Sequence, residues 1–303
     1  MAVGKRDEEG PMAPVHMFSH GSTMMLGEES ASADYWKKCG DEALAHGVEH
    51  VVMMGAHWAT SLPGILISAH PKPGKSPVAY VHPSKYQSYA LNPDLAYVPV
   101  LQQQLAAAGI PSAPDATFDW IHDTYLVLIR MFPGGCPPTT ILSMNQTYDP
   151  HFHMSVGAAL RPLREWSRHR TLFVGSGGAV HNLPRPRALG PRLPPGGRLG
   201  LLPGPRGERA RRRGRGRARH PVQCEAGGAG GPLLRRKITS LMKHPKYRDA
   251  HGTDDHFMAT MFVAGLCGGR GDENIVGEMG AEDWELTNMC NSQFTLGSWA
   301  DVK

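Results

Sequence analysis

The stretch Val51–Trp58 (VVMMGAHW) restricts the fold of this chain more than any other part of the sequence. Four apolar residues lead directly into Gly55, and His57 and Trp58 follow. An apolar run without polar alternation, closed by glycine, is typical of a strand buried on both faces. Ligands of open α/β sheets bind at the carboxyl ends of such strands. The stretch therefore predicts that His57 lies at the rim of a site.

The same arrangement recurs along the chain. A predicted strand at Pro14–Ser19 ends in His20, and one at Thr171–Val174 ends in GSGGAVHNL, which carries His181. Ser30 or Ser32 can cap a helix that runs to about His46, and this helix separates the first strand from Val51–Met54. Strand–helix–strand order favours parallel pairing. The fold class predicted is α/β: a single domain with a mostly parallel central sheet flanked by helices.

Other segments fit this architecture. Helices are expected over Asp94–Ala108, within Asp119–Met131 and over about Ser155–Arg168, and strands over Gly64–Ser68 and Thr139–Met144. For Glu278–Trp299 we expect a short acidic helix and a final edge strand. We expect a flexible tail over residues 1–13 and a catalytic domain over residues 14–303.

Composition limits the class of protein. The 303 residues are 41% hydrophobic and 19% charged, which is ordinary for a globular domain. The sequence contains neither a signal peptide nor the ~18–20 apolar residues of a membrane helix, so no membrane partner is expected. Five cysteines without a CxxC pair predict reduced thiols and a cytoplasmic location.

Residues 184–236 interrupt the pattern. They contain 14 arginines and two acidic residues, a net charge of +12, so the rest of the chain carries −7 within the total of +5. Three interpretations compete: a basic linker that binds nucleic acid, a solvated insertion, and a stretch translated out of frame in a GC-rich gene. We favour the third, because the composition changes abruptly at Leu183/Pro184. Nucleic acid is therefore not expected as a partner, and the segment is expected to be disordered.

The sixteen histidines invite a metal interpretation, but several are excluded. The HxxEH spacing of His46–His50 matches a class of zinc peptidase only if both histidines share one helical face. Gly47 and the strand at Val51 prevent that. His151 and His153 are expected on a surface loop.

Four other histidines each lie at the end of a predicted element, at a turn rich in Gly or Asp: His20, His57, His181 and His256. For His256 the turn is Asp254-Asp255, which we expect to cap a helix. Imidazole binds Zn, Fe, Cu or Ni, and the spacing does not select among them. These positions predict a metal site at the carboxyl ends of the strands.

Several motifs carrying these histidines resemble one family. SHGS (Ser19–Ser22), GAHW (Gly55–Trp58), GSGGAVHNL (Gly175–Leu183) and DHF (Asp255–Phe257) are similar, in this order, to class III extradiol ring-cleavage dioxygenases, in particular the branch of 4,5-DOPA dioxygenase extradiol-like proteins. Trp120–Pro133 also resembles the D-H-G-x-W…P-L…M-Y-P stretch of that family, with Asp123 in place of its glycine. Residues 184–236 have no counterpart.

The resemblance implies a non-haem Fe(II) enzyme that opens a catechol ring with O2. By motif, His20, His57 and His256 match the metal ligands, and zinc can occupy such a site. His181 matches an active-site histidine that counts as a fourth ligand in some members, and His122 a histidine on the substrate side. A histidine titrates near neutral pH, so His181 is the candidate for accepting and returning a hydroxyl proton, and His122 for a hydrogen bond to substrate. Trp58 is expected either to contact the catechol ring or to pack in the core.

Alternatives remain open at this point. A zinc-dependent hydrolase on a similar scaffold fits an all-imidazole site, although the motifs offer no evident carboxylate base. An inactive family member is a second alternative, because the Arg/Pro/Gly segment 184–236 replaces a region expected to be helical and would leave apolar surface uncovered. The sequence does not give the oligomeric state, the catechol or the ring position cleaved.

Overall fold

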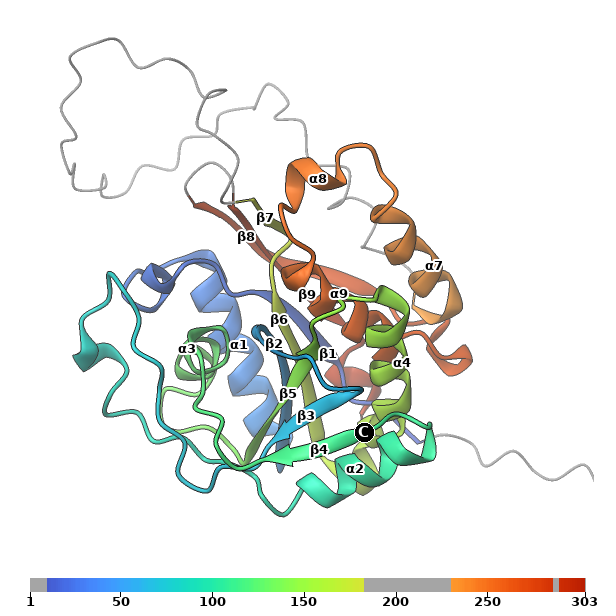
Figure 1. The fold of residues 1–303 in the computed structure, drawn as a ribbon, viewed down its shortest axis with the longest axis horizontal. Helices are drawn as coiled ribbons and strands as arrows, with labels where there is room; N and C mark the ends of the chain where they lie inside the picture. The colour runs from blue at the N-terminus through green and yellow to red at the C-terminus, as the bar shows by residue number, and fades with distance from the viewer. Residues whose placement is uncertain (1–9, 183–229, 286–288, 303) are drawn as a thin grey trace, which may run out of the picture.

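The apolar runs of the sequence form the centre of a nine-stranded sheet (Figure 1). The computed structural model describes residues 10–182, 230–285 and 289–302. The strand order is β4-β3-β5-β2-β6-β1-β9-β7, and β8 pairs with β9. The strands are β1 (Val15–Ser19), β2 (His50–Thr60), β3 (Ile65–Ser68), β4 (Ser112–Asp115), β5 (Thr139–Asn145), β6 (Thr171–Gly177), β7 (Val180–His181), β8 (Gly277–Glu285) and β9 (Met289–Leu296).

The middle of the sheet is parallel. β5, β2, β6 and β1 are neighbours with the same direction, and Val51 lies opposite Thr139 on one side and Leu172 on the other. β9 is antiparallel to β1, β7 and β8, and β3 is antiparallel to β5. This confirms the prediction of a mostly parallel central sheet. The residues Val51–Met54 are fully buried, as expected for a strand covered on both faces.

Helices cover both faces of this sheet (Figure 1). Alternate residues of β2 point to opposite faces, so Val51 and Met53 belong to one apolar core and Val52 and Met54 to the other. The first core is closed by α1 (Ala31–Ala45) and α3 (His122–Met131). The second is closed by α2 (Val98–Ala107), α4 (Pro150–Leu160), α7 (Gly231–Leu241) and α9 (Asp255–Leu266), and the short helices are α5 (Trp166–His169) and α8 (Tyr247–Ala250).

The boundaries of α1 follow the sequence signals. The Ser30 hydroxyl accepts a hydrogen bond from the Ala33 N–H (3.0 Å), and Gly47 adopts a φ of +78° after the helix ends. His46 follows the last residue of α1, whereas His50 begins β2. The two histidines of the HxxEH spacing therefore lie in different elements, which confirms their exclusion as a helical metal motif.

The acidic C-terminal segment was expected to be a helix, and this prediction is wrong. Gly277–Glu285 is the strand β8, paired along its length with β9. β9 is not an edge strand, because it also pairs with β1 and β7. The α1 helix holds β8 in place: Tyr35 packs against Gly280, where a Cβ would lie 1.8 Å from its ring, and the Ser32 N–H donates to Asp283 (2.7 Å). Tertiary pairing overrides the weak local preference here.

Two helices begin at other residues than predicted. α4 starts at Pro150 because the Asp149 carboxylate accepts the N–H of His151 (2.8 Å) and proline suits a first helical turn. His151 is exposed as expected, but His153 is fully buried and its Nε2 accepts the Asn145 N–H (3.2 Å). α2 starts at Val98 rather than Asp94, because the Asp94 N–H bonds the Thr139 carbonyl (3.0 Å).

The limits of the tail and of the Arg-rich segment also differ from expectation. Residues 184–229 and 1–9 lie outside the described residues, so most of both predictions falls there. Residues 231–236, however, begin α7, with Pro232 in the first turn, where its missing N–H costs nothing. At the other end Ala13 is fully buried, and its N–H donates to the Arg164 carbonyl (2.8 Å).

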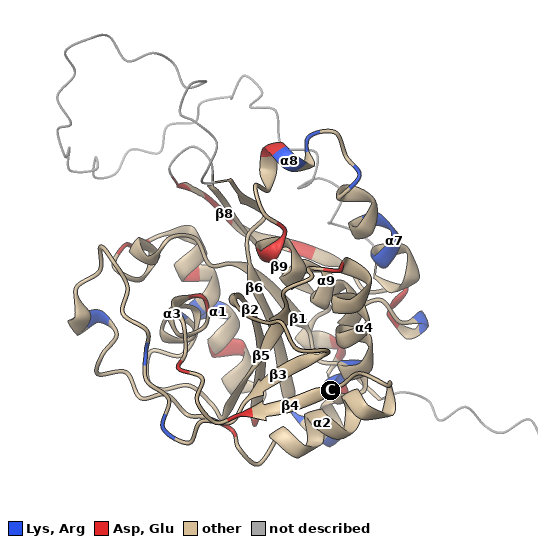
Figure 2. Ribbon diagram, viewed as in Figure 1, with Lys and Arg blue, Asp and Glu red and all other residues tan. Residues whose placement is uncertain are grey.

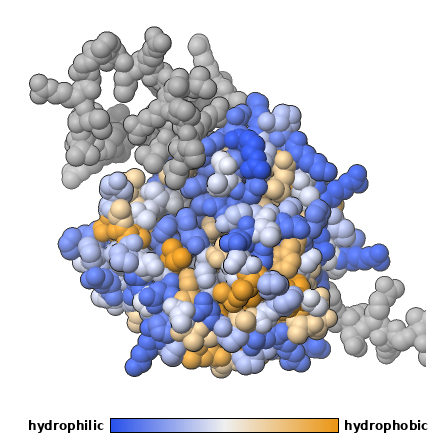
Figure 3. Space-filling model, viewed as in Figure 1, coloured by the Kyte–Doolittle hydropathy of each residue, from blue (hydrophilic) through white to orange (hydrophobic). Residues whose placement is uncertain are grey.

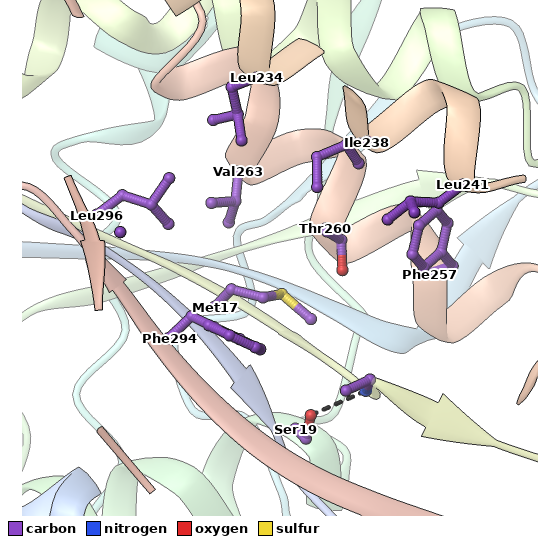
Figure 4. A pocket seen from close by; sticks show the side chains of 12 residues that line it. Met17, Ser19, Leu234, Ile238, Leu241, Phe257, Thr260, Val263, Phe294 and Leu296 are labelled. Atoms are coloured by element: carbon purple, nitrogen blue, oxygen red, sulfur yellow. Dashed lines mark hydrogen bonds between the residues drawn. The ribbon is translucent and has the colours of Figure 1, made fainter. Parts of the chain in front are cut away.

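An apolar pocket lies between α7, α9 and the sheet (Figure 4). Leu234 and Ile238 of α7 face Val263 of α9 and Phe294 of β9 across it. Its lining does not include any of the four histidines singled out in the sequence. Leu234, Ile238 and Leu241 of α7 line this pocket, and its lining also includes Ser19 and Phe257, the sequence neighbours of His20 and His256.

The surface is mixed in character. On the face shown in Figure 3, hydrophobic residues form small patches between hydrophilic ones. Charged residues of both signs are distributed over the described helices and loops (Figure 2). Among the described helices, none is long and apolar enough to span a membrane.

Candidate metal centre

Three of the predicted histidines converge at the carboxyl ends of the parallel strands. One nitrogen each of His20, His57 and His256 lies within 4.8 Å of the other two, a group that could hold a metal ion. The ring centroids of His20 are 5.3 Å from His57 and 5.1 Å from His256, and the last two are 4.9 Å apart. Residues 236 positions apart in sequence thus offer imidazole nitrogens to one point.

The position of His57 differs in one respect from the sequence prediction. The strand does not end before this residue, because β2 continues to Thr60. Instead, the pairing with β5 shifts between Met54 and Ala59, so that four residues of β2 lie opposite one of β5. Such a bulge re-aims side chains at the rim of a sheet. His57 lies in this bulge, and its side chain is the exposed member of the group, whereas His20 and His256 are buried.

His256 reaches the site because two glycines let α9 approach β6. A Cβ at Gly177 would lie 2.1 Å from the His256 carbonyl oxygen, and the Gly178 N–H donates to that oxygen (3.2 Å). This is the local reason for the GSGG sequence. Asp254 precedes α9 as predicted, but its side chain forms no capping hydrogen bond with the described residues of the helix. Its carboxylate instead accepts hydrogen bonds from Tyr247 and Arg248.

Neighbouring oxygens orient two of the rings. The Nδ1 of His256 is 3.0 Å from the Asp255 carboxylate, which can only accept, so Nδ1 carries the proton. The Nδ1 of His20 is 3.3 Å from the Ser176 hydroxyl, whose own proton is donated to the Asp123 carbonyl (2.5 Å). Both rings therefore keep their Nε2 lone pairs free. The His256 Nε2 is buried without a hydrogen-bond partner, which is the condition that a metal ion would relieve.

The electrostatics favour the neutral form of His20 and His57. Burial lowers the pKa of His20 well below its ordinary value, and the nearby His256 and His57 lower it further. The pKa of His57 is also lowered, first by loss of solvent and then by His256, while Asp123 opposes the shift. Neutral imidazole is the form that binds metals. The residues therefore fit a divalent cation.

His122 and His181 lie beside this group. His122 is the first residue of α3, with its ring 4.5 Å from His57 and 5.7 Å from His20. His181, in β7, stacks on His256 with centroids 3.6 Å apart and planes within 9°. It lies outside the group of three whose nitrogens meet. Burial, reinforced by nearby histidines, lowers the pKa of both His122 and His181 to about 4, although Asp123 and Asp255 respectively oppose the shift.

Several residues at the site did not stand out in the sequence. Asp123 is buried, and its carboxylate accepts the His57 N–H (2.8 Å). Ser176 bonds His20, and Glu285 accepts the N–H (2.8 Å) and hydroxyl (2.6 Å) of Ser22, in the turn that follows His20. An acidic residue next to His122 was the one available signal. Trp58 stacks on Phe118 at 3.7 Å, which favours a packing role for this tryptophan.

Comparisons with known proteins give a consistent picture. Residues 14–194 match the family model of the catalytic LigB subunit of aromatic ring-opening dioxygenase. The chain is 31% identical over 191 residues to a 4,5-DOPA dioxygenase extradiol of Portulaca grandiflora, covering 60% of this chain and 65% of that protein. It is 28% identical over 173 residues to a protein of the same name from Escherichia coli K12, covering 56% and 60%. The chain thus spans less than two thirds of these relatives.

A solved structure shows the same fold. The crystal structure of an uncharacterized protein from Escherichia coli K12 matches with a TM-score of 0.66 and 20% sequence identity. The match covers 94% of this chain and 100% of that one.

Proposed function

We propose that this chain, which belongs to the family of the catalytic LigB subunit of aromatic ring-opening dioxygenases, opens the ring of a DOPA-like catechol with O2. The resemblance stated from the motifs is confirmed at the level of this family. The family gives the ring-opening dioxygenase class. The catechol, the metal, and the roles of individual residues are proposals argued from the site.

One observation carries the proposal: three imidazoles converge and leave the buried Nε2 of His256 without a partner. We propose His20, His57 and His256 as the metal ligands and Fe(II) as the metal used in the reaction, with zinc as a possible occupant. Three protein ligands leave open positions on a divalent ion. When bound, the metal would polarise the catechol hydroxyls and bring substrate and O2 together.

The reaction adds both atoms of O2 across one carbon–carbon bond beside the two hydroxyl-bearing carbons and yields an open-chain semialdehyde acid. The catechol must lose hydroxyl protons to react, and the site must accept them. His122 and His181 are neutral near pH 7 because their pKa values are lowered to about 4. A neutral ring nitrogen at the rim can take a hydroxyl proton and return it later.

We propose different roles for these two histidines. His181 is half-buried and stacks on His256, so it lies against one side of the three histidines. It is our candidate for the base. Its motif also implies a second role, as a fourth metal ligand. His122 contacts the opposite members, His57 and His20, and is the candidate hydrogen-bond donor to the substrate. The side chains of Asp123 and Asp255 are engaged with His57 and His256. They are therefore poorly placed as bases of a zinc hydrolase.

The cellular setting is proposed from the cysteines. Cys39, Cys136 and Cys267 are buried free thiols. Buried reduced thiols fit a reducing compartment, so we propose a cytoplasmic location.

The experiment is anaerobic loading of the full chain with Fe(II), followed by a catechol such as DOPA and then O2. We expect O2 uptake in a one-to-one ratio with substrate and a yellow semialdehyde product. His181→Ala should lower turnover while metal content is retained, and His57→Ala should remove the metal. Absence of O2 uptake with several catechols, by a protein that holds one metal per chain, would reject the reaction and favour the hydrolase or the inactive alternative.

The Arg-rich segment needs its own control. Deleting residues 184–229 should leave metal content unchanged if the site belongs to the described domain alone. RNA binding that disappears with this deletion would support the nucleic-acid interpretation of the segment.

A further inference from the structure

We propose that Asp123 is a positioning residue that holds the His57 segment of β2 in place and provides a buried negative charge beside the three imidazoles. The proposal rests on the proposed metal site, but it concerns a residue outside the ligand set. It follows from how differently the three histidines are held.

His57 is the ligand without a ring anchor. The ring of His20 bonds the Ser176 hydroxyl and the ring of His256 bonds the Asp255 carboxylate. The His57 ring forms no hydrogen bond to another described residue. Its backbone N–H, however, donates to the Asp123 Oδ2 (2.8 Å). The position of His57 therefore depends on its backbone, and the backbone bond depends on Asp123.

The bulge makes this bond necessary. Between Met54 and Ala59 the register with β5 is broken, so residues of β2 here lack their normal place in the ladder. A backbone N–H that leaves a ladder and finds no other acceptor is costly. The Asp123 carboxylate replaces the missing ladder partner at the residue that carries the imidazole.

Gly55 provides the space for this contact. A Cβ at Gly55 would lie 2.3 Å from the Asp123 Oδ2 and 2.8 Å from its Cγ. Both distances are too short for real atoms, so the carboxylate occupies the volume that any other residue at position 55 would fill. Its φ is not in the left-handed region, so the glycine is needed here for space and not for conformation. Substituting Gly55 thus disturbs the same contact from the other side.

Asp123 also connects to the second ligand. Its backbone carbonyl accepts the Ser176 hydroxyl, which in turn bonds the His20 ring. This link runs through the main chain, so it survives a change of the Asp123 side chain. Side-chain variants therefore test the His57 link alone.

The charge of Asp123 is the second part of the argument. Asp123 is 1% exposed, and within the described ranges no Lys, Arg or His forms a side-chain ion pair with it. Burying an unpaired carboxylate is expensive unless something compensates for it. The proposed ligands are neutral imidazoles, which leave the charge of a divalent cation uncompensated. A cation at the histidines would offset the cost of the buried carboxylate, and the carboxylate would strengthen its binding.

The test is titration of metal-free full-length protein with Co²⁺, following both the dissociation constant and the visible absorption spectrum of the bound ion. Asp123→Ala removes both the hydrogen bond to the His57 N–H and the negative charge. We expect the affinity for Co²⁺ to fall ~10–100-fold, the range for residues that orient metal ligands, and the absorption spectrum of the bound ion to change. Asp123→Asn keeps an acceptor for the His57 N–H, so its spectrum should remain close to wild type while affinity falls less. Gly55→Ala should resemble Asp123→Ala.

Asp119→Ala is the matched control. The Asp119 carboxylate, four residues earlier, likewise accepts a backbone N–H, that of Gly74 (2.6 Å), but it is outside the histidine cluster. This variant should bind Co²⁺ as the wild type does. If Asp123→Ala fails to fold, judged by circular dichroism, Asp123→Asn and Gly55→Ala decide the question.

The outcomes separate this proposal from the proposed function. Unchanged affinity and spectrum in Asp123→Ala, or in both Asp123→Asn and Gly55→Ala, would overturn the positioning role. Co²⁺ binding that depends on Asp123 in a protein that opens no catechol would support the positioning role and reject the activity. A wild-type protein that binds no metal would overturn both.

Discussion

Two buried polar clusters of this molecule show what distinguishes a structural cluster from a functional one. In the first, Arg161 and Arg164 both contact the buried Asp272, at 2.6 Å and 3.1 Å. The remaining Arg164 donors bond the carbonyls of Ala13 and Leu266. Opposite charges meet here, and hydrogen bonds tie the chain near its N-terminus to the end of α9.

The histidine cluster has the opposite character. Like groups face one another, the surrounding histidines lower the pKa of His20 beyond the effect of its burial, and the Nε2 of His256 has no hydrogen-bond partner. Asp123 and Asp255 oppose these shifts only in part, so the arrangement costs stability in the metal-free protein. Burial of polar groups alone therefore does not identify a site. Ligand atoms that converge and remain unsatisfied do.

The largest effect should come from removing a ligand. In His256→Ala we expect metal binding and catechol-dependent O2 uptake to be lost, because only two of the three proposed ligands remain for the ion. The fold should persist, because the histidines do not stabilise one another: their rings repel when they are protonated. Metal content after dialysis and circular dichroism measure the two properties. His151→Ala, at an exposed position, is the control, and retention of one metal per chain by His256→Ala would contradict the assignment.

The complementary change is Asp272→Asn. It removes the negative charge that faces the fully buried Arg164 guanidinium at 3.1 Å, which should lower the free energy of unfolding by about 3–5 kcal/mol. Urea unfolding of the metal-free protein measures this loss. Metal affinity of the folded variant should be unchanged. Lys37→Met, which removes an exposed pair with Asp41, should cost less than ~1 kcal/mol. If Asp272→Asn is as stable as Lys37→Met, the two clusters do not differ in the way described.

A third expected effect is a pH dependence of stability in the metal-free protein. The folded pKa values of His122 and His181 are about 4 and that of buried His16 is about 3, all below the value of about 6.5 in an unfolded chain. Between these values the unfolded chain binds more protons, so stability is complete above about pH 6.5 and falls as the pH decreases toward 4. The slope should be roughly 1 kcal/mol per pH unit for the fully buried His16 and less for His122 and His181, whose side chains are partly exposed to screening solvent. Urea midpoints across this range test the expectation; a flat profile would contradict it, and saturating Zn²⁺ should protect the fold.

Local sequence rules determined the framework of this protein. Apolar runs fixed the central strands, Ser30 fixed the start of α1, and small-residue turns fixed which histidines lie at the carboxyl ends. These features depend on a few neighbouring residues, so they can be predicted without the rest of the chain. The order of the motifs also sufficed to indicate the family.

Other features arose only from contacts between distant segments. β8 is a strand because β9 and α1 hold it. The bulge that directs His57 into the site depends on the pairing of β2 with β5. The space at Gly55 is occupied by the carboxylate of Asp123, which lies 68 positions later in the sequence. The sequence by itself supplied the imidazoles and their places at strand ends. Only the tertiary structure decided which nitrogens meet and what holds them, because distance, burial and hydrogen bonding across the sheet are not encoded in any one segment.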